Sequence, residues 1–128
     1  MALHRVLIVG TGSIGERHLR CFAASGRADV SLCELDDERR RAVADRHAIN
    51  RSFGDLPAAL EDGCDAAVIA TPAPLHVPMA TQLAEAGTHL LIEKPLSTSF
   101  DGVARLEQLI AARGIVAAVA YVYRAHPA

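Results

Sequence analysis

The sequence predicts an α/β fold with a doubly wound, mostly parallel sheet between two layers of helices. Three observations support this class: short apolar segments recur, segments of helical length and period separate them, and glycines follow several helical segments. Most of the apolar segments lack polar alternation, which is typical of strands covered on both faces. Repeated right-handed crossovers between such strands build a sheet of this kind.

The strands are expected where apolar residues run together. A weaker strand is also expected near residues 49–53, where the pattern is less continuous. The five clearer segments are residues 6–9, 30–33, 66–69, 90–92 and 115–119. In a doubly wound sheet, the loops that follow such strands form the ligand crevice at their carboxyl ends.

The helices are expected between these strands. Gly26, Gly87 and Gly114 follow three of them, at the position where a left-handed residue commonly ends a helix. Thr98 and Asp101 have the spacing of a capping box for the last helix. The expected helical segments are residues 14–25, 37–47, 57–61, 75–86 and 100–113.

Composition excludes several classes of protein. Hydrophobic residues make up 51% of the 128 residues and charged residues 22%, which is typical of a single folded domain. A net charge of -2 offers no basic surface for nucleic acid. The three cysteines lack the paired spacing of disulfide or zinc sites. Neither a signal sequence nor a membrane-length apolar run is evident, so we expect a cytoplasmic protein.

The segment VLIVGTGSIG places a glycine-rich turn between the first strand and the first helix. Gly10 permits a tight turn, Gly12 lets backbone amides approach a pyrophosphate, and Gly15 permits close helix–strand packing. The alternative is an ordinary glycine-rich turn, since this motif alone is weakly specific. We predict a dinucleotide site formed by Gly10, Thr11, Gly12, Ser13, Ile14 and Gly15.

Glu34 ends the second expected strand, at the distance from the glycines where a carboxylate accepts hydrogen bonds from the adenosine ribose. A carboxylate there also repels a 2′-phosphate, which favours NAD over NADP. The nearby arginines at residues 39–41 leave NADP as an alternative. Glu34 has a second interpretation as a solvated carboxylate at an acidic helix start.

Lys94 is the only lysine in the chain, since the other members of the 13 Lys+Arg are arginines. It follows the fifth strand within the triplet Glu93, Lys94 and Pro95. Pro95 fixes its own φ and restricts Lys94, which is expected to aim the ammonium group into the crevice; a cis peptide before Pro95 is an option. A compact ammonium can bond both a ribose hydroxyl and a substrate oxygen. The alternative is an exposed charge beside Glu93.

The sequence resembles the N-terminal part of the glucose-fructose oxidoreductase and inositol dehydrogenase family. The resemblance covers essentially the whole chain and is carried by GTGSIGERHLR, ATPAPLHVPMATQLAEAGTHLLIEKPLSTS and AYVYRAHP. It implies a Rossmann fold and hydride transfer between a nicotinamide cofactor, NAD or NADP, and a sugar, polyol or related alcohol or carbonyl compound. In that family the EKP lysine lies beside the nicotinamide ribose and the reacting oxygen, so Lys94 is the implied catalytic residue.

The resemblance implies further contacts with the cofactor. Many members have asparagine where this chain has Ala73, so one expected contact is missing. For His76, an equally weighted alternative is a residue at the start of a helix whose ring forms hydrogen bonds with nearby backbone groups. No metal is predicted, because the histidines lack metal-site spacing. The implied contacts are Thr71, Pro72, His76, Glu93 and Arg124.

The resemblance also divides the chain into an NAD(P)-binding domain at residues 1–120 and the start of a crossover at residues 121–128. In the family a second, α+β domain shapes the substrate site, and we expect that domain to be missing from this chain. Hydride transfer needs a substrate held against the nicotinamide, so cofactor binding is expected to survive better than turnover.

The sequence also leaves two alternatives to a dehydrogenase domain. One is a nucleotide-sensing or regulatory Rossmann module without catalysis. The other is an S-adenosylmethionine-dependent methyltransferase, which would share the glycine turn but gives no reason for EKP. The expected partners are a dinucleotide and, in a full-length parent, a sugar or polyol; a homo-oligomer is left open, and neither nucleic acid nor membrane is expected.

Overall fold

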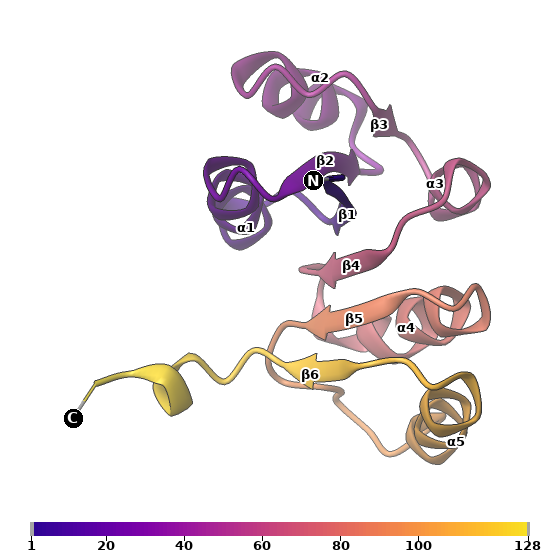
Figure 1. Cartoon of the computed structure of the whole chain (residues 1–128). Coiled ribbons are helices and arrows are strands. Elements are labelled where there is room, and N and C mark those ends of the chain that lie inside the picture. The colour runs from indigo at the N-terminus through magenta and orange to yellow at the C-terminus, as the bar shows by residue number, and fades with distance from the viewer. Residues whose placement is uncertain (1, 128) are drawn as a thin grey trace.

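A computed structural model describes residues 2–127, and across them the strands form one six-stranded parallel sheet with helices on both faces (Figure 1). The strand order is β3-β2-β1-β4-β5-β6, which reverses between β1 and β4 and confirms the predicted doubly wound Rossmann fold. The strands are β1 His4–Val9, β2 Ala28–Cys33, β3 Ser52–Phe53, β4 Ala66–Ile69, β5 His89–Ile92 and β6 Ala117–Val119.

The helices also follow the predicted alternation. Gly26, Gly87 and Gly114 have φ values of 66°, 79° and 63°, which confirms their expected left-handed conformation. Within residues 2–127, no helix is long and apolar enough to cross a bilayer. The helices are α1 Ser13–Ala24, α2 Asp37–Arg46, α3 Leu56–Asp62, α4 His76–Glu85 and α5 Val103–Arg113, with 3-10 turns η1 Ala73–Leu75 and η2 Val122–Ala125.

The capping box predicted for the last helix is wrong. Helix α5 begins at Val103, and its N-cap is Gly102 with a φ of 76° and no capping side chain among the described residues. Instead of capping a helix, Asp101 donates its backbone N–H to the Ser99 hydroxyl at 3.2 Å. A serine hydroxyl that bonds nearby backbone favours a turn over a helix, so the loop after β5 extends further than the pattern indicated.

Two hydrophobic cores lie on opposite faces of the sheet. Successive side chains of a strand point to opposite faces, so β1 contributes Val6 and Ile8 to one core and Leu7 and Val9 to the other. Helices α1 and α2 cover the first core, and helices α3, α4 and α5 cover the second. Burial on both faces explains why the strand sequence shows no polar alternation.

Candidate functional site

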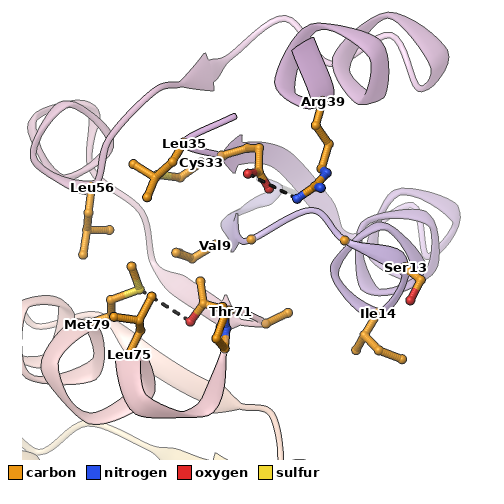
Figure 2. A pocket seen from close by; sticks show the side chains of 15 residues that line it. Val9, Ser13, Ile14, Cys33, Leu35, Arg39, Leu56, Thr71, Leu75 and Met79 are labelled. Carbon is orange, nitrogen blue, oxygen red and sulfur yellow. Dashed lines mark hydrogen bonds and ion pairs between the residues drawn. The ribbon is translucent and has the colours of Figure 1, made fainter. Parts of the chain in front are cut away.

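A cavity of about 410 Å³ lies at the carboxyl ends of β1, β2 and β4, on the edge of the sheet where the strand order reverses (Figure 2). Its size is within the range of ligand pockets. Parallel strands end at the same edge, so loops distant in sequence meet there. The cavity brings together the predicted site residues Gly10, Gly12, Ser13, Ile14, Glu34, Thr71 and Pro72.

The glycine turn after β1 requires glycine at two positions and leaves space at a third. Gly10 has a φ of 86°, and a Cβ there would lie 2.8 Å from the Ala70 carbonyl oxygen. A Cβ on Gly15 would lie 1.8 Å from the Gly10 carbonyl oxygen, so the helix could not pack as closely on the strand. A Cβ on Gly12 would meet no atom of the described chain within 4 Å. The turn is therefore tight at its base and open above Gly12.

Helix α1 begins directly beneath this open space. Gly12 is its N-cap, and no side chain within residues 2–127 caps it. The first backbone bond that closes on the cap runs from Glu16 N–H to the Gly12 carbonyl oxygen at 2.9 Å, which leaves the amides of residues 13–15 ahead of the helical ladder. Such amides, together with the positive end of the helix dipole, bind phosphate groups. These residues fit a pyrophosphate.

Glu34 lies at the end of β2 with its side chain 9% exposed. Its Oε2 accepts hydrogen bonds from Thr11 N–H at 2.8 Å and from the Thr11 hydroxyl at 3.1 Å. Its Oε1 accepts from Asp36 N–H at 3.1 Å and lies 3.7 Å from Arg39 Nη1. A carboxylate has about four acceptor positions, so Oε1 retains capacity for a ligand hydroxyl. Glu34 is thus oriented mainly by backbone donors.

Thr11 has a different place from the one predicted. It is 2% exposed and lies outside the cavity lining, because both its amide and its hydroxyl are directed at Glu34. Thr11 therefore fixes Glu34 to the glycine turn. No local pattern indicates this contact, since the two residues are 23 positions apart.

Several wall residues of the cavity were not predicted from the sequence. Leu56 of α3 and Met79 of α4 face it, and their positions depend on helix rotations that the sequence pattern leaves open (Figure 2). Cys33 could have been found, because it is the last residue of β2. Burial, with the Asp55 and Glu34 charges, raises the pKa of the Cys33 thiol to about 11. The thiol is therefore protonated near neutral pH, and Cys33 lines the cavity as an unreactive residue.

The segment 93–95 lies at the carboxyl end of β5, the strand next to β4 on this edge. Lys94 is exposed and lies outside the lining of the 410 Å³ cavity. The peptide bond between Lys94 and Pro95 is cis, as the sequence allowed. Glu93 Oε1 lies 2.6 Å from His18 Nε2, a contact for which the sequence offered no signal across 75 positions.

His76 and Arg124 also lie outside the cavity lining. His76 is 1% exposed, with Nε2 at 2.7 Å from the Thr71 carbonyl oxygen and Nδ1 at 2.8 Å from the Pro95 carbonyl oxygen. The structure thus agrees with the alternative of a histidine bonded to backbone. Arg124 is exposed within η2. Among residues 2–127, no cluster of three or more histidine, cysteine or carboxylate side chains could hold a metal ion.

Comparison with known proteins agrees with this geometry. Residues 4–121 match the model of the oxidoreductase family, NAD-binding Rossmann fold. The chain is 34% identical over 122 residues to D-xylose 1-dehydrogenase (NADP(+)) 2 of Haloferax volcanii, covering 94% of this chain and 38% of that protein. It is 30% identical over 127 residues to scyllo-inositol 2-dehydrogenase (NAD(+)) of Bacillus subtilis, covering 97% and 37%.

A solved structure gives the same result in three dimensions. The WlbA dehydrogenase from Bordetella pertussis, crystallised with NADH and UDP-GlcNAcA, is similar with a TM-score of 0.85 and 31% identity, covering 92% of this chain and 37% of that chain. The chain thus spans about two fifths of the length of these relatives. The fold, the glycine turn and the family match lead to one conclusion: the chain belongs to the glucose-fructose oxidoreductase and inositol dehydrogenase family of oxidoreductases, and it corresponds to the family's NAD-binding Rossmann domain.

Proposed function

We propose that this chain binds NAD along the carboxyl edge of the sheet, as the cofactor domain of a sugar or polyol dehydrogenase. The observation that carries the proposal is the open space above Gly12, beside a helix start whose first amides are uncapped by side chains of the described chain. A pyrophosphate fits there, because the space beside Gly12 holds no described atom within 4 Å of a Cβ position, which leaves room for its oxygens near the amides of residues 13–15. The adenosine half then extends toward β2 and the nicotinamide half toward β5.

Each half of the dinucleotide has a residue of this chain assigned to it. At the adenosine end, Glu34 Oε1 would accept hydrogen bonds from the ribose hydroxyls while Thr11 holds Oε2. At the other end, Lys94 Nζ would donate to a nicotinamide ribose hydroxyl and to the reacting oxygen of the substrate. The bound cofactor supplies hydride exchange. Lys94 supplies a proton donor or acceptor at that oxygen.

The substrate class follows from the relatives, which are named for xylose and inositol. We propose an alcohol or carbonyl group of a sugar or polyol, selected by a further domain of a longer parent protein. In this scheme residues 1–120 form the cofactor domain and residues 121–128 begin the crossover. The chain by itself would bind NAD with little or no turnover, because hydride transfer needs a substrate held against the nicotinamide.

NAD is the proposed cofactor in preference to NADP. A 2′-phosphate would stand against Glu34, whose side chain is 9% exposed and cannot turn away without breaking its bonds to Thr11. Arg39 lies 3.7 Å from Glu34 Oε1 and is 52% exposed, so its attraction for a phosphate is screened by solvent. The two curated relatives differ in the cofactor that their names give, so the residues of this chain carry the preference.

Calorimetric titration tests the proposal on the chain itself. NAD is expected to bind with a Kd below about 1 mM, and Gly12→Ala is expected to weaken it at least about tenfold, or ~1.4 kcal/mol. The added methyl would occupy the space for the pyrophosphate, yet it meets no described atom within 4 Å, so the melting temperature should fall only by the small cost of alanine at a helix N-cap. A chain that gives no binding heat at millimolar NAD would contradict the proposal.

The catalytic part of the proposal needs the longer parent protein. There, Lys94→Ala is expected to lower turnover of a polyol substrate by a much larger factor than it lowers NAD affinity, because the side chain acts on the reacting oxygen. Steady-state kinetics with a parallel NAD titration measure both effects. Unchanged turnover would remove Lys94 from the mechanism.

A further inference from the structure

We propose that His18 and His76 are positioning residues that hold Lys94 from both sides. The inference rests on the proposed function, in which Lys94 serves the nicotinamide end of the site. The residue before Lys94 is bonded to His18 of α1, and the residue after it is bonded to His76 of α4. Two helices on opposite faces of the sheet therefore fix one exposed residue through its neighbours.

The first contact joins α1 to Glu93. His18 lies in the second turn of α1, and its Nε2 is 2.6 Å from Glu93 Oε1, with side chains 21% and 15% exposed. An ionised carboxylate only accepts hydrogen bonds, so Nε2 carries the hydrogen. Glu93 Oε2 in turn accepts the backbone N–H of Lys94 at 3.3 Å. The helix whose first turn would receive the pyrophosphate is thus connected to the backbone of Lys94.

The second contact joins two loops of the same sheet edge. His76 Nδ1 is 2.8 Å from the Pro95 carbonyl oxygen, and Nε2 is 2.7 Å from the Thr71 carbonyl oxygen. Carbonyl oxygens only accept, so a neutral ring donates to one of them and a ring protonated on both nitrogens donates to both. The imidazole is 1% exposed, so water cannot easily replace it. It fixes the segment after β5 against the loop after β4.

The exposure of Lys94 gives these contacts their importance. A lysine side chain is long and flexible, and an exposed one on a mobile loop would sample many positions. A reacting group is effective only when it is held within a narrow range of geometry by the residues around it. Lys94 is exposed, yet both its neighbours are bonded to buried or half-buried imidazoles. The side chain therefore starts from a fixed backbone position.

The chain provides a matched control for the first contact. His47 Nε2 lies 2.7 Å from Glu16 Oε1, with side chains 17% and 22% exposed, so this pair resembles the His18 pair in distance and burial. It differs in that Glu16 Oε1 also accepts from Arg46 Nη1 at 2.5 Å. It joins α1 to the residue that follows α2, and neither Glu16 nor His47 is hydrogen-bonded or ion-paired with the segment 93–95. If a histidine–carboxylate pair acted only on general stability, removing either pair would have the same effect on Lys94.

The test measures the order of Lys94 by nuclear magnetic resonance. In the unaltered chain and in His47→Ala, the amide order parameter of Lys94 is expected near 0.85, about the value of rigid backbone. His18→Ala is expected to lower it below about 0.6. His18→Gln should restore it, because the glutamine amide nitrogen can occupy the place of Nε2. Equal order in His18→Ala and His47→Ala would overturn the proposal.

Two substitutions at His76 separate its two bonds. An asparagine amide nitrogen occupies the place of Nδ1 and a glutamine amide nitrogen that of Nε2. His76→Asn should keep the bond to Pro95 and the order of Lys94, whereas His76→Gln should keep only the bond to Thr71 and lose that order. Both variants keep a polar buried side chain, so their melting temperatures should be similar. Lower order in His76→Asn than in His76→Gln would contradict the assignment.

The proposed function is tested separately in the same samples. Because Lys94 is the only lysine, reductive methylation with carbon-13 formaldehyde labels its side chain and the N-terminal amine alone. NAD should shift the Lys94 methyl signal in the unaltered chain, and this shift should weaken at least about threefold in His18→Ala. Order parameters that change as expected without any NAD shift would support the positioning contacts and contradict the cofactor role of Lys94.

Discussion

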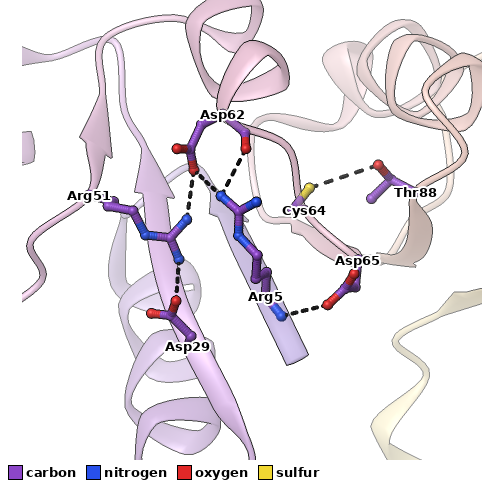
Figure 3. A network of polar contacts seen from close by, with 7 residues as sticks. All are labelled: Arg5, Asp29, Arg51, Asp62, Cys64, Asp65 and Thr88. Carbon is purple, nitrogen blue, oxygen red and sulfur yellow. Dashed lines mark hydrogen bonds and ion pairs between the residues drawn. The ribbon is translucent and has the colours of Figure 1, made fainter. Parts of the chain in front are cut away.

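The two edges of the sheet hold their charged side chains in different ways. At the amino ends of the strands, Asp62 Oδ2 accepts from Arg5 Nη2 and Arg51 Nη1, both at 2.6 Å (Figure 3). Arg51 Nη2 also lies 2.8 Å from Asp29 Oδ2 as an ion pair, without the alignment of a hydrogen bond. At the carboxyl ends, Glu34 is oriented by the backbone amides of other residues and borders a cavity.

The number of charged side chains at an edge of the sheet does not identify a ligand site. At the amino edge the charged groups neutralise one another, so little of their electrostatic attraction is available to a ligand. At the carboxyl edge one carboxylate is held mainly by uncharged donors, and the amides at the start of α1 have no capping side chain within residues 2–127. The candidate site is therefore defined by a few groups whose charge or hydrogen-bonding capacity is not used up by other side chains.

The largest effect is expected from Gly15→Ala. Its Cβ would lie 1.8 Å from the Gly10 carbonyl oxygen, and backbone cannot move aside cheaply. We expect a loss of about 3 kcal/mol or more in the free energy of unfolding, together with loss of NAD binding. Urea denaturation measures the loss, with Gly12→Ala as the control at the same turn. Equal stability of the two variants would contradict the packing role of Gly15.

The next effect concerns the amino edge. Asp62→Asn removes the charge that both arginines share, and we expect a loss of about 1–2 kcal/mol in the free energy of unfolding because the groups are half-buried. NAD affinity should not change. The control is Glu85→Gln at the exposed pair with Arg105, where the change should stay within about 0.5 kcal/mol. A weaker NAD affinity in Asp62→Asn would contradict the independence of the two edges of the sheet.

Glu34→Gln should change cofactor preference more than stability. The glutamine carbonyl oxygen can still accept from Thr11, while the negative charge that repels a 2′-phosphate is gone. We expect the ratio of the NADP to the NAD dissociation constant to fall about tenfold, or ~1.4 kcal/mol, with Arg39 then favouring the phosphate. Paired calorimetric titrations measure this ratio. An unchanged ratio would remove Glu34 from cofactor selection.

Cys33 lines the cavity, so the rate at which its thiol is alkylated measures access to the cavity. Its pKa of about 11 leaves little thiolate near pH 8, so iodoacetamide should modify it much more slowly than the exposed Cys21, and NAD should slow it further. The pKa of the Cys33 thiol in the folded chain lies above its ordinary value of 9.0. The thiol therefore contributes folding stability that is complete below about pH 9 and is lost as the pH rises through about 11. Mass spectrometry of the two cysteines gives the rates; equal rates would contradict the burial.

Much of the fold could be predicted because its signals are local. Continuous apolar runs gave the strands, and Gly26, Gly87 and Gly114 marked helix ends through their own backbone conformation. The last helix start was missed because Ser99 competes for the backbone amide of Asp101. That competition depends on a loop geometry that spacing alone does not reveal.

The candidate site likewise has features that could be predicted from adjacent residues and features that could not. The glycine turn was predictable, since tight turning, close approach and helix packing each act on adjacent residues. The contacts of Thr11 with Glu34 and of His18 with Glu93 join residues 23 and 75 positions apart, and only the folded sheet brings them together. The cofactor contact of His76 stays a prediction: its ring is bonded to the Thr71 and Pro95 carbonyl oxygens, and the orientation of a helix-start side chain depends on the loops around it.

The most direct measurement is the map of amide shifts as NAD is added to the nitrogen-15 labelled chain. We expect saturable shifts at residues 10–15, Glu34 and Thr71, with smaller shifts at Lys94. Arg5 and Asp62 on the opposite edge should keep their positions. Shifts centred on the amino edge, or no shifts at millimolar NAD, would contradict NAD binding at the carboxyl edge of the sheet.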